Sequence, residues 1–239
     1  MILKGILTSA FLAATFSSAL AADAKEDVTK AAKALAEKGN YSWKTTVGVP
    51  ANSQFTPGPT EGKADKDISY ITMSFRDNKT EAYIKGDKAA YTDQNGEWQS
   101  AADDAGGEGP GRFMGRFIRN IKPPAGQAEE IAGLVKEFKK DGDAYSGDLT
   151  EEGAKTLIGR ARGRGGAGGG DAPEVKGAKG TAKFWVKDGV LSKFEYQVKG
   201  QTKNRNGEDV DVDRTTTTEI KDVGTTKLTV PETVKKKLA

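Results

Sequence analysis

Between residues 180 and 220 the sequence alternates apolar and polar side chains over three consecutive stretches. In the middle stretch, Phe194, Tyr196 and Val198 alternate with charged or amide residues. Successive side chains of a strand point to opposite faces, so this period predicts strands with one apolar and one charged face. Two dipeptides typical of hairpin turns, Asp188-Gly189 and Asn206-Gly207, separate the stretches. The segment therefore predicts antiparallel strands that bury one face only.

The same period recurs in the first half of the chain. Tyr41 to Val49 alternates in this way, and residues 62–100 have the turn-rich pattern of a β-meander that ends at Asn95-Gly96. We expect strands at residues 41–49, 68–75, 80–85, 89–92, 97–99, 144–146, 180–187, 191–201, 209–220 and 228–230. Together they predict one antiparallel sheet.

Helical spacing of apolar residues appears in four segments, at residues 23–38, 112–121, 127–138 and 148–158. Asp148 is the expected N-cap of the last of these helices, with Glu151 as its capping-box partner. A final helical turn follows Pro231. An antiparallel sheet with a few helices belongs to the α+β class.

Residues 1–21 have the features of a secretory signal peptide. Lys4 gives a positive start, Ile6–Phe16 is almost wholly apolar, and Ala19-Leu20-Ala21 supplies the small residues of a cleavage site. The alternative is a membrane anchor, but the apolar run is shorter than the roughly 20 residues of a spanning helix. We expect cleavage after Ala21 and a single domain at residues 22–239, soluble in the periplasm or outside the cell.

The chain contains no histidine and no cysteine. It therefore lacks the groups for Ser-His-Asp or Cys-His catalysis, for imidazole or thiolate metal sites and for disulfides. The formal net charge of +3 is close to balance and gives no general case for a nucleic-acid partner. Carboxylate, Lys, Ser, Thr or Tyr chemistry remains, or binding alone. We expect no enzyme activity, no catalytic residue, no cofactor, no metal and no nucleic-acid partner.

Several short motifs follow one another along the mature chain. They are Tyr41-Ser42-Trp43, Asn95-Gly96-Glu97-Trp98, Gly147-Asp148-Leu149-Thr150 with Ala154 and Leu157, the hairpin from Phe184 to Gly189, and the closing pairs Val223-Gly224 and Val230-Pro231. This ordered set covers nearly the whole mature chain and resembles the LolA/LppX-like superfamily of exported lipid and lipoprotein carrier proteins. The Gly- and Arg-rich segment at about 159–177 departs from that pattern and looks like a flexible, disordered insertion.

The resemblance implies an antiparallel, strongly curved sheet, an incomplete β-barrel, with helices covering its concave face. It also implies an apolar cavity between sheet and helices for a lipid or the acyl chains of a lipoprotein. The expected function is a non-enzymatic carrier or envelope sensor. The alternative is a cavity-less structural or interaction module that binds an envelope protein or polymer through its exposed faces.

Apolar side chains on the expected inner face are the candidates for lipid binding. They are Trp43, Phe113, Phe117, Ile118, Ile121, Phe184, Phe194, Tyr196 and Val198. The helix at 112–121 carries an apolar stripe flanked by arginines, which is compatible with a cavity lid, with a membrane surface or with plain packing on the sheet. An aromatic row on adjacent strands is more often a filled core than the lining of a cavity.

Three charged groups suggest sites only weakly. Asp209, Asp211 and Asp213 resemble the start of a calcium loop, but Arg214 and Ile220 stand where that loop requires Gly and Glu. Arg160, Arg162 and Arg164 lie among glycines, and Asp103, Asp104 and Glu108 lie in a Gly-rich stretch. We interpret all three groups as solvated charges.

Overall fold

The computed structural model describes residues 14–51, 53, 56–75, 78–101, 110–161, 174–204 and 206–239. Its main element is one sheet of eleven strands in the order β6-β5-β4-β3-β2-β1-β11-β10-β9-β8-β7. The strands are β1 Asn40–Gly48, β2 Thr60–Asp65, β3 Ile68–Phe75, β4 Asn78–Lys85, β5 Lys88–Thr92, β6 Trp98–Ser100, β7 Lys139–Asp141, β8 Ala144–Asp148, β9 Val175–Lys187, β10 Val190–Lys203 and β11 Asp209–Lys221.

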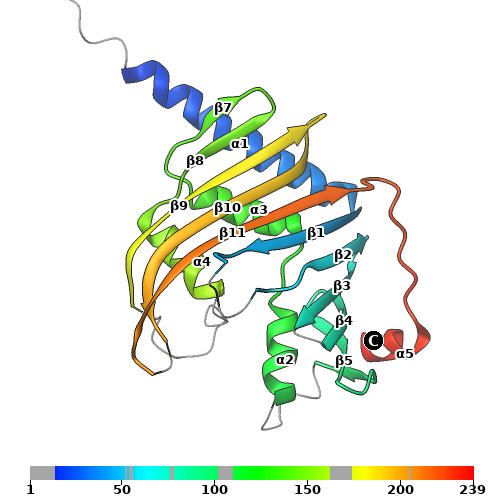
Figure 1. The fold of residues 1–239 in the computed structure, drawn as a ribbon. Coiled ribbons are helices and arrows are strands. Elements are labelled where there is room, and N and C mark those ends of the chain that lie inside the picture. Colours follow the sequence, from blue (N-terminus) through cyan, green and yellow to red (C-terminus); the bar gives the residue numbers. More distant parts are fainter. Residues whose placement is uncertain are drawn as a thin grey trace, which may run out of the picture.

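The sheet is antiparallel throughout and open, with β6 and β7 as its two edges. The chain enters at the centre in β1, runs outward to β6, crosses through helices to β7, and returns through β8–β10 to β11. There β11 pairs with β1, with Trp43 opposite Ile220. Figure 1 shows the long strands β9–β11 curving strongly. The predicted α+β class with an open, curved antiparallel sheet is confirmed.

The register assigns alternate residues to two faces. In the β10–β11 pair, Phe194 lies opposite Thr218 and Tyr196 opposite Thr216, on the face that also carries Trp43. We call this the inner face, and the opposite one the outer face. A bulge in β9 interrupts the period at Gly177, whose φ of 60° is readily available to glycine.

Five helices in the described part of the chain accompany the sheet: α1 Ala14–Lys38, α2 Pro110–Arg119, α3 Pro124–Gly133, α4 Glu151–Ala161 and α5 Glu232–Lys237. Helix α1 packs against α3, β9 and β10, and α4 packs against β9 and β10, which places these helices on the inner face (Figure 1). Helix α2 packs on β4 and β5. Within the described residues, the inner face is therefore covered at both ends of the sheet by helices.

Helix α5 departs from the expected arrangement, because it covers the outer face. Val234 and Leu238 pack with Tyr83 and Ala90, whereas Ile118 of α2 packs with the residues that alternate with these two. Figure 1 shows α2 and α5 on opposite sides of β4 and β5. This half of the sheet is a sandwich between two helices.

The main core lies between α1, α3, α4 and the inner face of the long strands. Phe138, Phe184 and Phe194 form a row in which neighbouring ring centroids are 5.8 and 6.3 Å apart. Val28 and Leu35 of α1 are fully buried in the same cluster. Each buried side chain of this size contributes about 1.5–3 kcal/mol to folding.

Several expected boundaries were wrong for local reasons. Helix α3 begins three residues early, because Pro124 is tolerated in the first turn, and ends at Gly133 rather than Phe138. The residue that caps α4 is Thr150 rather than Asp148, since the Gly153 N–H donates to Thr150 Oγ1 at 2.9 Å.

The strand expected at residues 228–230 is absent from that described segment, which packs irregularly beside α5. Strands β2 and β7 were not predicted, because both are short and polar. The ends of the expected Gly- and Arg-rich loop are regular structure, since α4 runs to Ala161 and β9 begins at Val175. Residues 162–173 lie outside the described part.

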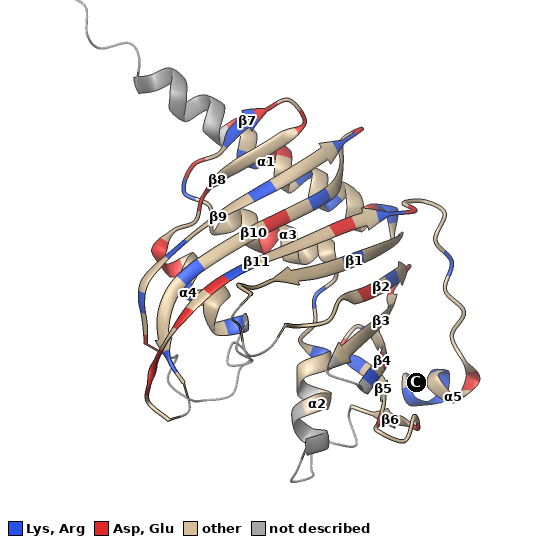
Figure 2. Cartoon of the chain, viewed as in Figure 1, with Lys and Arg blue, Asp and Glu red and all other residues tan. Residues whose placement is uncertain are grey.

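The outer face of the long strands is charged, as the alternation predicts (Figure 2). Asp213 pairs with Lys199 at 2.9 Å, Asp209 with Lys203 at 4.0 Å, and Gln201 donates to Asp211 at 3.2 Å. The three aspartates therefore form part of a charged strand face, as the sequence indicated.

Candidate functional site

The inner face changes in burial along each central strand. Tyr41 and Trp43 at the start of β1 are buried, whereas Val47 near its end is half-buried. In β11, which runs the other way, Ile220 is buried and Val212 is half-buried at the matching end. One end of the inner face is thus filled by the core, and the other retains solvent exposure.

The helices explain this gradient. Helices α1 and α4 contact β9 and β10, and α2 contacts β4 and β5. The central strands β11, β1, β2 and β3 lie between these two groups of helices. We use the term half-buried inner surface for the five residues Val47, Met73, Tyr196, Val212 and Arg214, all partly exposed on the inner face of these strands and of β10.

Arg214 is the charged member of this surface. It lies directly opposite the fully buried Val198 in the β10–β11 register. Burial lowers the pKa of Arg214, and the nearby Tyr196 phenol acts in the opposite direction. The neighbouring inner residue, Thr216, is 5% exposed, and its Oγ1 has no hydrogen-bond partner among the described residues.

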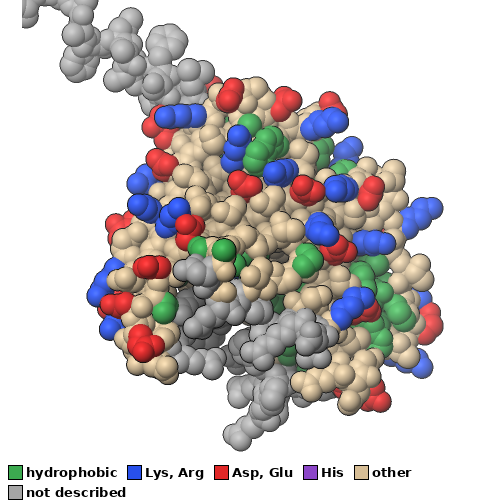
Figure 3. Space-filling model, in the orientation of Figure 1, with side chains coloured by type: hydrophobic (Ala, Val, Ile, Leu, Met, Phe, Trp, Pro, Cys, Tyr) green, Lys and Arg blue, Asp and Glu red, His purple; other side chains and the backbone are tan. Residues whose placement is uncertain are grey.

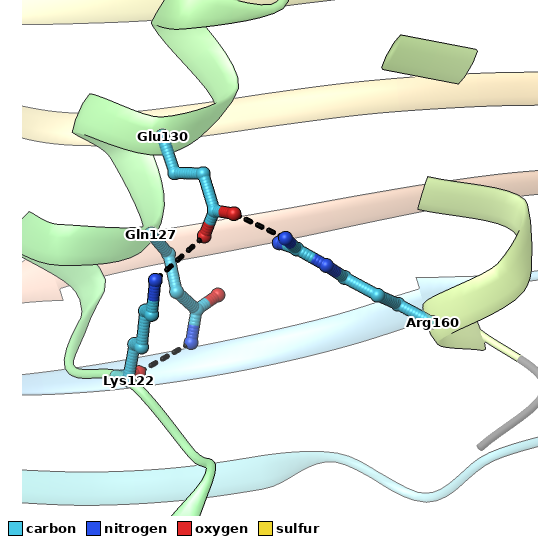
Figure 4. Close-up of polar contacts among 4 residues, drawn as sticks. All are labelled: Lys122, Gln127, Glu130 and Arg160. Carbon is cyan, nitrogen blue, oxygen red and sulfur yellow. Dashed lines mark hydrogen bonds and ion pairs between the residues drawn. The ribbon is translucent and has the colours of Figure 1, made fainter. Parts of the chain in front are cut away.

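An ion-pair cluster joins α3, α4 and the segment before α3 (Figure 4). Glu130 accepts from Arg160 and from Lys122, the latter at 3.1 Å between Nζ and Oε2. Gln127 Nε2 donates to the Lys122 carbonyl at 2.6 Å. The hydrogen bond from Arg160, followed by that from Lys122, holds the pKa of Glu130 below its ordinary value against the effect of burial.

Tyr196 lies near both Arg160 and Arg214. Its phenol acts electrostatically on both Arg160 and Arg214, and the hydrogen bond to Glu130 is the main cause that raises the pKa of Arg160. Arg160, which lies outside the half-buried inner surface, is paired with Glu130.

Most of the sequence-predicted site residues are core residues. Phe184, Phe194 and Val198 are fully buried. Trp43 packs over β2 at Gly62, where an added Cβ would lie 2.2 Å from the Trp43 ring. The expected row is present: Phe184, Phe194 and Val198 are fully buried, and Tyr196 is half-buried.

The candidates on α2 divide between packing and exposure. Ile118 is fully buried against Ala82, Ala89 and Tyr91, and Ile121 is half-buried beside it. Phe117 is 42% exposed. The side chain of Phe113 lies outside the described residues, as do those of Arg162, Arg164, Asp103, Asp104 and Glu108.

Sequence reasoning missed Arg214, Val212 and Thr216 as site residues. One signal was available. All inner positions in residues 209–220 are Val, Thr or Ile, except for Arg214. A charged residue in the apolar phase of a strand is unusual enough to mark a candidate site.

On the outer face, Figure 3 shows positive and negative side chains intermingled over the strands. Trp185 lies there beneath Lys193 and Lys183, whose Nζ atoms are 4.5 and 5.0 Å from its ring centroid. Among the described helices, none is long and apolar enough to span a membrane. The described residues also contain no group of three or more acidic side chains arranged to hold a metal ion.

No protein-family model and no curated protein matches the chain. Solved structures that match it include the crystal structure of LprF from Mycobacterium bovis, with a TM-score of 0.44 and 12% sequence identity over 89% of this chain and 98% of that one. They also include the crystal structure of the Mycobacterium tuberculosis lipoprotein LppX, with a TM-score of 0.42 and 7% identity over 83% of this chain and 93% of that one.

Proposed function

We propose that this chain is an exported, non-enzymatic binding protein that holds a lipid, or the acyl chains of a lipoprotein, between its sheet and its helices. The observation that supports this proposal most directly is the half-buried inner surface. Apolar side chains of three strands, Val47, Tyr196 and Val212, are partly exposed on the face that elsewhere forms the core. Partly exposed apolar surface in that position is stabilised when a ligand covers it, at about 0.8 kcal/mol per buried CH₂.

The buried aromatic row limits where such a ligand can lie. Phe184 and Phe194 already fill their end of the inner face, so an acyl chain in the proposed site lies along β1, β10 and β11 near Val212. Full burial of this row also supports the alternative, a cavity-less module that binds an envelope protein or polymer through its outer face. The two functions differ in whether the half-buried inner surface takes up an amphiphile.

A binding experiment separates the two functions. The full chain, extracted with organic solvent to remove bound lipid and refolded, is titrated with a fluorescent fatty acid. We expect saturable binding, and we expect Val212→Asp to weaken it at least tenfold because the substitution places a carboxylate on the apolar surface. Val186, which is half-buried at the opposite end of the long strands, provides the matched control Val186→Asp.

The control variant is expected to bind as the wild type does, provided that circular dichroism shows both variants folded. If the fatty acid shows no saturable binding to the wild-type chain, the proposed function is contradicted and the alternative, an interaction module, is favoured. Equal loss in the two variants would show that the effect is not confined to the inner surface.

We further propose export through cleavage after Ala21, followed by contact with a membrane surface through residues 112–121. The exposed Phe117 supports the membrane contact, since an aromatic side chain on a surface helix enters the lipid interface readily. Mass spectrometry of the secreted or periplasmic protein tests the cleavage, because the proposal requires a mature N-terminus at Ala22.

A further inference from the structure

The outer face of β9 carries a series of lysines. The strand contains four lysines and no acidic residue, and all four lysines are exposed. The β9–β10 register places them on the outer face, since they lie opposite, or alternate with, residues whose faces are already assigned. Lys193 faces outward beside them on β10. We use the term lysine row for these five residues: Lys176, Lys179, Lys183, Lys187 and Lys193.

The lysine row differs from the neighbouring lysines of the outer face in its lack of acidic partners. Lys199 of β10 is paired with Asp213 at 2.9 Å, and Lys221 of β11 with Glu219 at 3.2 Å. In the part of the chain that the structure describes, no carboxylate lies within 4.0 Å of an ammonium group of the row. The positive charge of the row is therefore not paired within the described residues.

Two acidic residues border the row without forming ion pairs with it. Glu195 lies opposite Lys183, but its carboxylate accepts from the Thr217 hydroxyl at 2.8 Å. Asp148 is exposed at the end of β8, opposite Thr181. Residues two apart on a strand are roughly 7 Å from each other, so the lysine charges repel one another. A chain of negative groups along β9 would remove that repulsion.

Trp185 places an aromatic ring within the row, between Lys183 and Lys187. The Nζ atoms of Lys193 and Lys183 lie 4.5 and 5.0 Å from its ring centroid, which is a cation–π arrangement. The ring thereby holds one ammonium group from each of two strands at the same position, and it remains half-buried rather than covered. An acidic sugar fits such a position, because its C–H face packs on an aromatic ring while its anionic substituent contacts the ammonium groups.

The distribution of charge on the outer face favours a narrow ligand. Asp209, Asp211 and Asp213 are on the same face of β11, which is separated from β9 by β10 alone (Figure 2). A planar anionic membrane over the long strands would meet these carboxylates, whereas a single chain along β9 would meet lysines. Among the described outer residues of β9, Trp185 is the one aromatic side chain, whereas single-stranded nucleic acids stack successive bases on several.

We propose that the lysine row and Trp185 bind a linear acidic polysaccharide. Its anionic groups contact the ammonium groups along β9, and one of its sugar rings packs against the Trp185 indole. The site is on the face opposite the half-buried inner surface, so the inference does not rest on lipid binding. It gives a chemical class to the polymer that the alternative function leaves open.

The first test is an isothermal titration of the full chain with a polygalacturonate oligomer, compared with the same oligomer after full methyl esterification. We expect saturable binding of the acidic form, at least about tenfold tighter than that of the neutral ester. Its affinity should fall about tenfold between about 50 and 200 mM NaCl, because the contacts are exposed ion pairs. Absence of binding to the acidic form, or equal affinity for the two forms, would overturn the inference.

A double variant tests the row itself. Lys183→Gln with Lys187→Gln is expected to weaken polygalacturonate binding about five- to tenfold, through the loss of two exposed ion pairs with the ligand. The matched control, Lys44→Gln with Lys221→Gln, removes the same net charge from the outer faces of β1 and β11, where both lysines have acidic partners. It is expected to change the affinity by less than about twofold. Equal losses in the two double variants would assign the binding to net charge and contradict a site on β9.

Trp185 distinguishes a polysaccharide from other polyanions. Trp185→Ala is expected to weaken polygalacturonate binding about tenfold and binding of inorganic polyphosphate by less than about twofold, because polyphosphate has no sugar to pack on the ring. Equal weakening for both ligands would contradict the sugar contact. If this variant fails to fold, the wild type is titrated with polyphosphate, oligothymidylate and phosphatidylglycerol vesicles at equal anionic charge. Binding of any of these as tight as that of polygalacturonate would overturn the proposed ligand class.

Discussion

Phe184 is a large, fully buried side chain on the inner face of β9, one of the two strands that α1 and α4 cover. It is fully buried and contacts Phe138 and Phe194 on either side. Its sequence neighbours Lys183 and Trp185 lie on the outer face, where the Lys183 ammonium is 5.0 Å from the centre of the Trp185 ring. At the scale of single residues, the inner face thus combines an end with complete packing and an end with partly exposed Val212 and Arg214.

Replacement of Phe184 by alanine measures this packing. We expect the free energy of unfolding to fall by about 3–5 kcal/mol in urea titrations, because the enclosed site cannot collapse around the missing ring. Lys179→Ala, an exposed change on the same strand, is the control and is expected to stay within about 0.5 kcal/mol of wild type. A loss below about 1 kcal/mol for Phe184→Ala would indicate space around the ring that the structure does not show.

Among the elements, α2 has two distinct sides. Its Ile118 anchors it in a small core with Ala82, Ala89 and Tyr91, which confirms packing of this helix on the sheet. On its exposed side, Phe117 is accessible to solvent. Of the apolar residues that suggested a lid or a membrane contact, Ile118 packs on the sheet and Phe117 is exposed to solvent.

The exposed side of α2 is the part that a membrane contact requires. We expect Phe117→Ala to reduce cosedimentation of the chain with anionic phospholipid vesicles by a few fold, because a single aromatic ring contributes about 1–2 kcal/mol of interfacial binding. The unfolding free energy should change by less than about 1 kcal/mol, since the ring is 42% exposed. Unchanged cosedimentation would assign α2 to packing alone.

For the whole molecule, two ion-pair clusters connect helices to the sheet or to each other. Tyr145 of β8 donates to Asp27 of α1 at 2.9 Å, and Lys140 of β7 lies 3.3 Å from the same carboxylate. Glu130 joins α3 to α4 through Arg160. The hydrogen bond from Tyr145 is the largest cause that lowers the pKa of Asp27, as that from Arg160 lowers the pKa of Glu130.

These shifts predict how stability depends on pH. Both folded-state pKa values lie below their unfolded values, so the stabilisation is present above the ordinary carboxylate pKa and is lost as pH falls through the folded values. We expect the free energy of unfolding to be nearly constant between about pH 6 and 8, because the chain has no histidine or cysteine, and to fall below about pH 4.5.

The double variant Asp27→Asn, Glu130→Gln should show a smaller decrease between pH 5 and 3 than the wild type, measured by urea unfolding at each pH. Its control is Glu26→Gln on the exposed side of α1. This change removes a carboxylate whose ion pair, with Lys30 one helical turn away, is exposed to solvent. An identical slope in the wild type and the double variant would show that other carboxylates control acid unfolding.

The sequence by itself determined the strands of the long hairpins, their two faces and the antiparallel class, because alternation and turn dipeptides act through neighbouring residues. It also indicated the resemblance to a group of carrier proteins through short motifs of the same kind. The short polar strands β2 and β7 were missed, since neither has an apolar period of its own.

Only the tertiary structure decided which apolar residues fill the core and which remain partly exposed. Phe194 and Tyr196 have the same place in the alternating pattern, yet the first is buried and the second is half-buried. The difference depends on the helices α1 and α4, which pack on β9 and β10 and come from separate parts of the chain, before β1 and between β8 and β9. The alternation in residues 209–220 already assigns Arg214 to the inner face, and the packing of the helices decides how far that face is covered.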